Sequence, residues 1–259
     1  MAGLSTVSVV PSRIGAFVES VGSYGTFVGK AFSSIGQRGT FFETLIQQMV
    51  RIGVNSLPVV MLASAFAGIV TTIQTAYQLQ FVILSEDTVG MVVGPTIMLE
   101  LAALIPGLVL ASRIGASMAA EIGTMQVTEQ IDALEAMGMN SVSFLVLPRV
   151  LAAVVMFPSI YVASALVAFV AGGISGEMLG YLTFETFIRG AQAYILPFDA
   201  VYGATKMLCF GFLITSIACW KGFTTVGGAD GVGKSTTGAV VTSCVSILIA
   251  DYVVAELLL

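Results

Sequence analysis

The sequence predicts an all-α, polytopic membrane protein with five transmembrane helices, an N-terminal amphipathic helix at the membrane interface and a short cytoplasmic helix. Hydrophobic residues make up 57% of the 259 residues, charged residues only 10%, and the mean hydropathy is +0.99. A soluble domain carries about 25% charged residues. Five separate stretches reach the roughly 20 apolar residues that a bilayer span needs. Helices are expected there because a helix satisfies its own backbone polar groups in lipid.

The N-terminal part, residues 1–56, is expected to lie at the interface, while 57–259 form the membrane domain. The strongest N-terminal helix is predicted over 40–53, where Thr40 and Glu43 have capping-box spacing. Its apolar and polar residues separate onto opposite sides at helical spacing, so we expect the helix to lie flat among the headgroups. The polar side contains Glu43, Gln47, Gln48 and Arg51.

Five apolar segments define the expected spans and their orientation. They cover residues 57–81, 94–118, 144–170, 200–220 and 236–259. Placing the N-terminus in the cytoplasm puts most basic residues on the inner side, as the positive-inside rule requires. These are Arg13, Lys30, Arg38, Arg51, Arg113, Arg149, Lys221 and Lys234. An odd number of spans then places the C-terminus on the outer side, and Trp220 is expected to anchor the inner interface.

The charge balance and residue types exclude several classes of protein. The net charge of −5 leaves no basic surface for nucleic acid. The chain has no histidine, the usual general base and commonest metal ligand, so neither a catalytic nor a metal site is expected. Cys209, Cys219 and Cys244 lie in apolar runs without paired spacing and are interpreted as small buried hydrophobic residues.

One motif is a false match. Gly228, Gly233, Lys234 and Ser235 fit the phosphate-loop pattern G-x-x-x-x-G-K-[ST]. That loop must follow a buried strand and open a helix, whereas here a membrane span lies on each side. We therefore expect these glycines to form a tight inner turn, with Ser235 or Thr236 capping the fifth span.

The inner loop 119–143 is the longest polar stretch between spans. Thr128 is predicted to cap a helix that ends at Gly138, a residue suited to the left-handed C-terminal position. The helix is amphipathic, with acidic residues away from its apolar face. A solvated loop helix and a docking element both fit this pattern.

Several motifs resemble the MlaE/YrbE-type permeases, the membrane subunits of the MCE-associated ABC lipid transporters. The most specific is Ala119-Ala120-Glu121-Ile122-Gly123-Thr124-Met125, followed by Val127-Thr128-Glu129-Gln130-Ile131-Asp132-Ala133-Leu134-Glu135 and by Leu147-Pro148-Arg149. The resemblance extends from about residue 40 to the end. One departure is Leu99-Glu100-Leu101-Ala102-Ala103, where many members have Arg-Glu-Leu-Gly-Pro.

This resemblance implies a phospholipid permease in the bacterial inner membrane, working through an MCE protein to maintain outer-membrane lipid asymmetry. It implies a homodimer with an ABC ATPase subunit beneath it, an MCE-domain protein on the periplasmic side and, in some systems, a STAS-domain protein. ATP would be bound by the ATPase, so no cofactor and no enzymatic activity are expected in this chain. The residues implied in coupling to the ATPase are Glu121, Thr128, Glu129, Gln130, Asp132 and Glu135.

Polar side chains inside the spans suggest where a lipid headgroup would bind. At about 1.5 Å per residue, Gln74, Glu100, Lys206 and Asp251 each lie roughly 9 to 12 Å below the outer ends of four different spans. Charges at this depth are costly and should avoid lipid. They could line a headgroup site, with Gln78 one turn from Gln74, or Glu100 and Lys206 could form a structural pair that only locks the bundle.

Two other functions compete with the permease hypothesis. An ion-coupled secondary transporter or channel would use the intramembrane acids as ion sites, but the chain shows no internal inverted repeat, which such folds often have. A purely structural membrane subunit is the other alternative. A permease should purify with an ATPase, a transporter alone, and a structural subunit should be dispensable for lipid movement.

Overall fold

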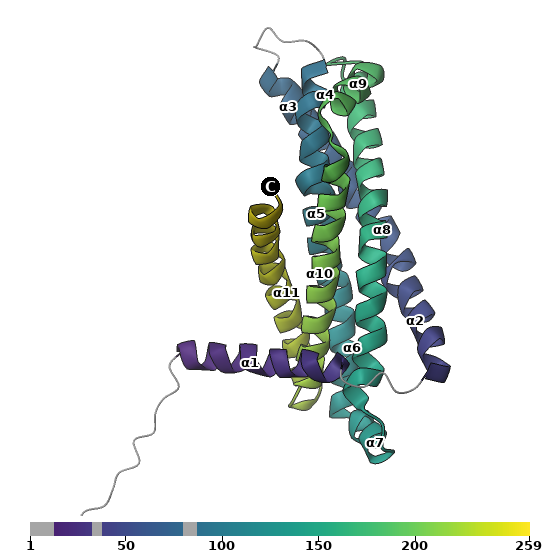
Figure 1. Cartoon of the computed structure of the whole chain (residues 1–259), viewed down its shortest axis with the longest axis vertical. Coiled ribbons are helices and arrows are strands. Elements are labelled where there is room, and N and C mark those ends of the chain that lie inside the picture. Colours follow the sequence, from purple (N-terminus) through teal and green to yellow (C-terminus); the bar gives the residue numbers. More distant parts are fainter. Residues whose placement is uncertain (1–12, 33–37, 80–86) are drawn as a thin grey trace, which may run out of the picture.

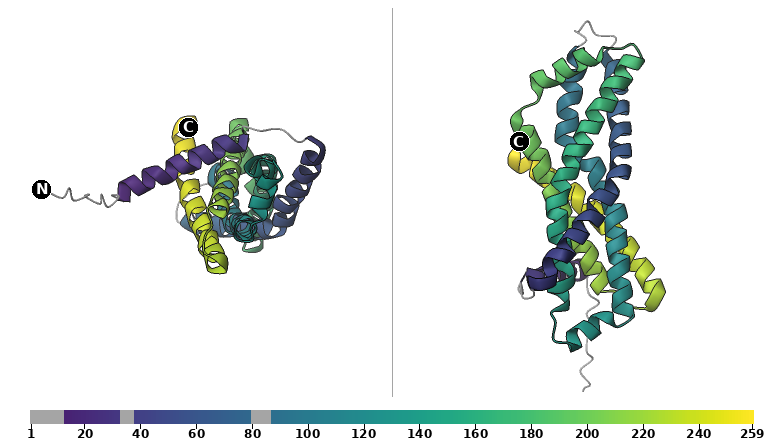
Figure 2. Two further views of the ribbon diagram at one scale, coloured as in Figure 1. Left: turned by 90° about the horizontal axis from the view of Figure 1, so that it is seen from below. Right: turned by 90° about the vertical axis from the view of Figure 1, so that its right-hand side faces the viewer.

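The computed structural model describes residues 13–32, 38–79 and 87–259, and within these ranges every regular element is a helix. Five helical units in this part of the chain are long and apolar enough to cross a membrane. They pack into an elongated bundle (Figures 1 and 2). The predicted all-α, five-span fold class is confirmed.

Two of the five units are built from several helical pieces. The first joins α2 (Arg38–Ile52), the short turn η1 (Val54–Ser56) and α3 (Leu57–Leu79). The second runs through α4 (Asp87–Thr96), η2 (Ile97–Leu101), α5 (Ala102–Leu110), η3 (Ala111–Gly115) and α6 (Ala116–Val127). The others are α8 (Ser141–Met178), α10 (Pro197–Phe223) and α11 (Gly228–Leu258). Units two to four extend beyond both predicted ends, because hydropathy detects only the apolar middle of a helix.

The second unit contains two π-helical turns, η2 and η3, and prolines that free backbone carbonyls inside the membrane. Pro106 has no N–H, so the carbonyl of Ala102 loses its helical donor. The Ser164 hydroxyl on α8 donates to that carbonyl at 2.7 Å. In η2, the Tyr161 hydroxyl donates to the Met98 carbonyl at 2.9 Å. Side chains of neighbouring helices thus satisfy groups that lipid could not.

The helices α3 and α8 pack closely through small residues. A Cβ at Gly68 would collide with the Ala168 carbonyl, and one at Gly172 would lie 2.6 Å from the Thr72 hydroxyl. Close approach through small residues is how membrane helices gain packing energy without a hydrophobic driving force.

The N-terminal helix α1 (Arg13–Phe32) lies across the lower end of the bundle, perpendicular to its axis (Figure 1). Tyr24 contacts the edge of the Trp220 ring, with 5.8 Å between ring centroids. The Tyr24 and Ser216 hydroxyls are 2.6 Å apart. Burial raises the pKa of the Tyr24 hydroxyl, an effect that the contact with Ser216 partly offsets. The orientation of α1 matches a surface helix anchored next to Trp220.

The helix α2 differs from its prediction in two ways. It begins at Arg38, so Thr40 lies inside it and is not its cap. It runs obliquely alongside α8, whereas α1 lies perpendicular to the bundle axis (Figure 1). The reason is that η1 continues the helical path directly into α3, which limits how far α2 can bend away.

The turn before α11 also differs from the prediction. Gly227 and Gly228 have positive φ angles of 92° and 65°, so the tight turn is formed by these two glycines. The helix begins at Gly228, and the Thr236 hydroxyl donates to the Val232 carbonyl inside it. The expected cap at Ser235 or Thr236 is therefore wrong. The phosphate-loop match is helical from Gly228 onward and forms no loop that could surround a phosphate.

Candidate functional site

Three charged side chains from three helices meet inside the bundle, and we call them the intramembrane triad: Glu100, Lys206 and Asp251. The fully buried Lys206 on α10 places its Nζ 2.7 Å from Glu100 Oε1 and 2.8 Å from Asp251 Oδ1. Its Nζ also donates to the Leu99 carbonyl at 3.2 Å. The structure therefore brings together three of the five residues expected at a headgroup site.

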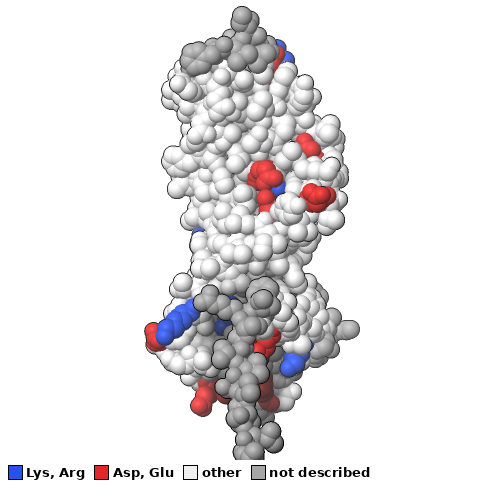
Figure 3. Space-filling view, turned by 90° about the vertical axis from the view of Figure 1, so that its left-hand side faces the viewer, with Lys and Arg blue, Asp and Glu red and all other residues white. Residues whose placement is uncertain are grey.

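The triad depends on the π-helical turn η2, which carries Glu100 and presents the Leu99 carbonyl. A π turn adds a residue to one turn and is often found at functional sites. With two carboxylates on one ammonium group, the triad carries one excess negative charge when all three are ionised. Figure 3 shows acidic side chains gathered about midway up the face on the α11 side, above the charged side chains of the lower end. Glu100 is the most accessible member, so the triad is approached through its carboxylate.

The structure does not place Gln74 and Gln78 in this cluster. Both are exposed on α3, and no hydrogen bond between described residues joins either one to the triad. The buried face of α3, which includes Gly68 and Thr72, packs against α8 instead. Equal depth in the membrane did not mean the same side of the bundle.

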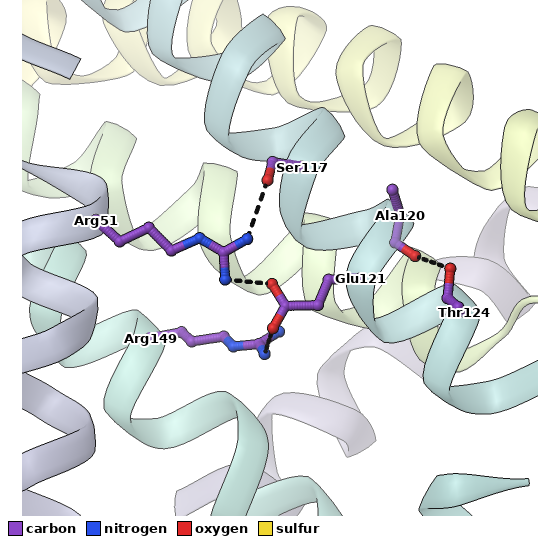
Figure 4. Close-up of polar contacts among 6 residues, drawn as sticks. All are labelled: Arg51, Ser117, Ala120, Glu121, Thr124 and Arg149. Atoms are coloured by element: carbon purple, nitrogen blue, oxygen red, sulfur yellow. Dashed lines mark hydrogen bonds and ion pairs between the residues drawn. The ribbon is translucent and has the colours of Figure 1, made fainter. Parts of the chain in front are cut away.

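A second ion cluster, which we call the inner network, joins Arg51, Glu121 and Arg149 (Figure 4). The Glu121 carboxylate on α6 accepts from Arg51 of α2 through one oxygen and from Arg149 of α8, at 2.8 Å, through the other. Arg51 also donates to the Ser117 hydroxyl at 3.4 Å. Glu121, expected to couple to an ATPase, thus connects three helices of this chain. Sequence reasoning missed both arginine partners, although Arg149 stood in the motif that carried the resemblance.

The short helix α7 (Gln130–Ala136) extends below the rest of the bundle (Figure 1). Ile131 anchors it by burial in a small apolar cluster that includes Ile122 and Val146. Its polar side is open to a partner, since Glu129, Gln130, Asp132 and Glu135 are all exposed.

The ends of α7 confirm one expectation and correct another. Gly138 adopts a left-handed conformation with φ 77°, as predicted. Thr128, however, ends α6, and its hydroxyl donates back to the Thr124 carbonyl. The residue at the start of α7 is Glu129, with φ 60°. Thr128 is therefore not the helix cap, because the chain reverses one residue later than the pattern indicated.

These features define a multi-pass α-helical membrane protein with two ion clusters between its helices and one short exposed helix below the bundle. The sequence matches the family described as Permease MlaE over residues 45–257. The chain belongs to this family, and it is a permease subunit.

Relatives with similar sequences support this assignment. A probable ABC transporter permease protein of Rickettsia bellii is 35% identical over 254 residues, covering 98% of both chains. Another from Synechocystis is 36% identical over 224 residues, covering 86% of this chain and 85% of the relative. Protein TRIGALACTOSYLDIACYLGLYCEROL 1, chloroplastic, of Arabidopsis thaliana is 36% identical over 215 residues, covering 83% of this chain and 61% of the relative.

Proposed function

We propose that this chain is the membrane permease of an ABC transporter that moves phospholipids between the inner and outer bacterial membranes, as part of a system that maintains outer-membrane lipid asymmetry. The observation that carries the proposal is the intramembrane triad, a polar site reached through Glu100 in a permease-family bundle with otherwise apolar walls. One relative bears the name of a glycerolipid, which supports a substrate with acyl chains.

In this proposal the triad orients the lipid headgroup. The Lys206 ammonium attracts a phosphate, and Glu100 and Asp251 keep the ammonium charged and oriented between substrates. The acyl chains pack against the apolar helices around the triad. Gln74 and Gln78, which are exposed on α3 and have no hydrogen bond to the triad among the described residues, are not part of it.

The energy source is a separate ABC ATPase, which binds ATP and docks on the exposed side of α7. Motion can pass between two sites only through an element that both sites bias. α7 has the form of such an element, because Ile131 fixes it to the bundle while Glu129 and Asp132 remain exposed to a partner. We propose that the chain lies in the bacterial inner membrane. In this orientation α7 and the N-terminus are in the cytoplasm, and the C-terminus is in the periplasm.

The remaining parts of the proposed assembly are a second copy of this chain, a periplasmic MCE-domain protein and, in some systems, a STAS-domain protein. The outer end of the bundle, where α9 (Phe184–Tyr194) packs on α4, is the proposed side of contact with the MCE protein. Co-purification from cells that express all components tests each contact.

Docking is tested with Glu129→Arg combined with Asp132→Arg. Reversing both exposed charges should prevent co-purification with the ATPase, or uncouple ATP hydrolysis from lipid transfer. Asp230→Arg, which changes an exposed acid in the first turn of α11, is the matched control. An intact complex with unchanged lipid transfer after the double substitution would refute the role of α7.

The headgroup site is tested with Glu100→Gln. This variant keeps side-chain volume and leaves Lys206 paired with Asp251, so the bundle should still assemble. Lipid crosslinking and transfer should both fall, whereas Glu256→Gln, at an exposed acid near the C-terminus, should leave them unchanged. Full transfer by Glu100→Gln would assign the triad a structural role only.

A further inference from the structure

A cavity of about 200 Å³ lies between α2 and the part of the second span formed by η3 and α6. Its rim is polar and exposed, with Arg51, Asn55, Arg113 and Ser117. Its floor is mostly apolar, with the buried Ile114 and Met118, and also includes the buried Ser56. A polar rim over an apolar floor is the arrangement expected for an amphipathic ligand.

The charges around the cavity favour an anion. Arg51 and Arg149 share the single carboxylate of Glu121, and Arg113 forms no ion pair with any described residue. The guanidinium groups therefore exceed the carboxylates that balance them. The π-helical turn η3 carries Arg113, just as η2 carries Glu100 in the triad. Guanidinium groups present planar pairs of N–H donors that match phosphate oxygens.

A buried hydroxyl adds an independent indication of a ligand. Ser56 is 1% exposed and lines the cavity, and its Oγ has no hydrogen-bond partner among the described residues. A buried polar group without a partner destabilises the fold, so such groups are normally paired. A phosphate oxygen within the cavity would accept the hydrogen bond that Ser56 can donate.

The surface above the cavity identifies the rest of the ligand. Asn55, Val59, Leu62 and Phe66 recur at helical spacing and are all exposed, so they form one stripe that rises from the rim along α3. Beyond Asn55 the stripe is apolar and suits an acyl chain. Free phosphate would make no use of it.

We infer that this cavity binds the phosphate group of a membrane phospholipid whose acyl chain lies along α3. The site is separate from the triad and does not require that the chain transport lipid. Arg51 and Arg113 hold the phosphate from the two sides of the cavity, and Ser56 donates from its base. Binding at this position joins α2 to the second span.

The test measures retention of dioleoyl phosphatidylglycerol by the full chain purified in neutral detergent, using native mass spectrometry. Dioleoylglycerol, which has the same chains and no phosphate, is the comparison ligand. Wild type should retain the phospholipid and not dioleoylglycerol. Arg113→Gln should weaken retention about tenfold or more, since a charge-assisted hydrogen bond is lost. Lys234→Gln removes an exposed cation elsewhere and should have no effect.

Two further arms make the result decisive. Ser56→Ala should weaken retention without lowering the thermal midpoint of the lipid-free protein, so it tests the site even if Arg113→Gln folds poorly. If inorganic phosphate displaces the phospholipid, the phosphate group alone is enough for binding. If it does not, the acyl chains also contribute to binding. Either result supports the site. Arg113→Gln should weaken retention further when it is added to Glu100→Gln, which separates this site from the triad. Equal retention of dioleoylglycerol, or unchanged retention in both Arg113→Gln and Ser56→Ala, would overturn the inference.

Discussion

The intramembrane triad and the inner network are two ion clusters of opposite charge, and each includes one residue of the second helical unit. In the triad, two carboxylates share Lys206, whose side chain is 0% exposed. In the inner network, two guanidinium groups share Glu121, and exposure ranges from 6% for Arg149 to 48% for Arg51. The central residue is thus the most buried member of the triad, whereas the most buried member of the inner network is a peripheral one.

This difference determines what a substitution leaves behind. Removing one partner of a buried ion pair costs far more than the pair itself contributes, because an uncompensated charge remains in a medium of low polarity. Pairs that reach water contribute little, since solvent screens the charges that remain. The two clusters should therefore respond very differently to the loss of a single ion pair.

The largest effect is expected for Lys206→Met. It leaves Glu100 and Asp251 facing each other without a cation, and should destabilise the bundle by about 3–5 kcal/mol. Thermal unfolding in detergent measures the loss. The triple variant Glu100→Gln, Lys206→Met, Asp251→Asn carries no charge at this position and should recover most of the stability. If the triple variant is no more stable than the single one, desolvated charge is not the cause.

A smaller effect is expected for Glu121→Gln. It leaves Arg149, at 6% exposure, without a counter-charge, and should cost about 1–3 kcal/mol. Arg149→Met leaves Glu121 paired with the more exposed Arg51, so it should cost less. The order of the two variants in thermal unfolding checks the comparison, and the reverse order would contradict it.

The triad shows what the sequence could predict and what it could not. The rise per residue of an α-helix predicted that Glu100, Lys206 and Asp251 lie at one depth. Because charge in lipid is costly, these side chains were expected to find partners inside the bundle. Gln74 was predicted at the same depth, but it is exposed on α3 and does not join the triad. Depth follows from counting residues along a helix. The side of the helix on which a side chain faces its neighbours depends on packing. In α3, small residues turn one face of the helix toward α8.

The π-helical turns were not predictable from hydropathy or from standard helix periodicity. Each adds one residue to a turn and rotates everything that follows, yet η2 carries Glu100 and η3 carries Arg113. The inner network was missed for a similar reason. Glu121 is 70 residues from Arg51 and 28 residues from Arg149 along the chain. Only tertiary packing brings the three residues together.

The smallest effect is expected for Arg51→Met, and it links the comparison to the proposed phosphate site. Arg51 is 48% exposed, and its loss leaves Glu121 paired with Arg149 at 2.8 Å. In neutral detergent without phospholipid, the stability change should stay below about 1 kcal/mol. With phosphatidylglycerol added, wild type should gain thermal stability and Arg51→Met should gain less, because a ligand stabilises only the state that binds it. A large loss in neutral detergent would show that Arg51 is as strongly coupled to the bundle as Lys206, and the contrast between the two clusters would fail.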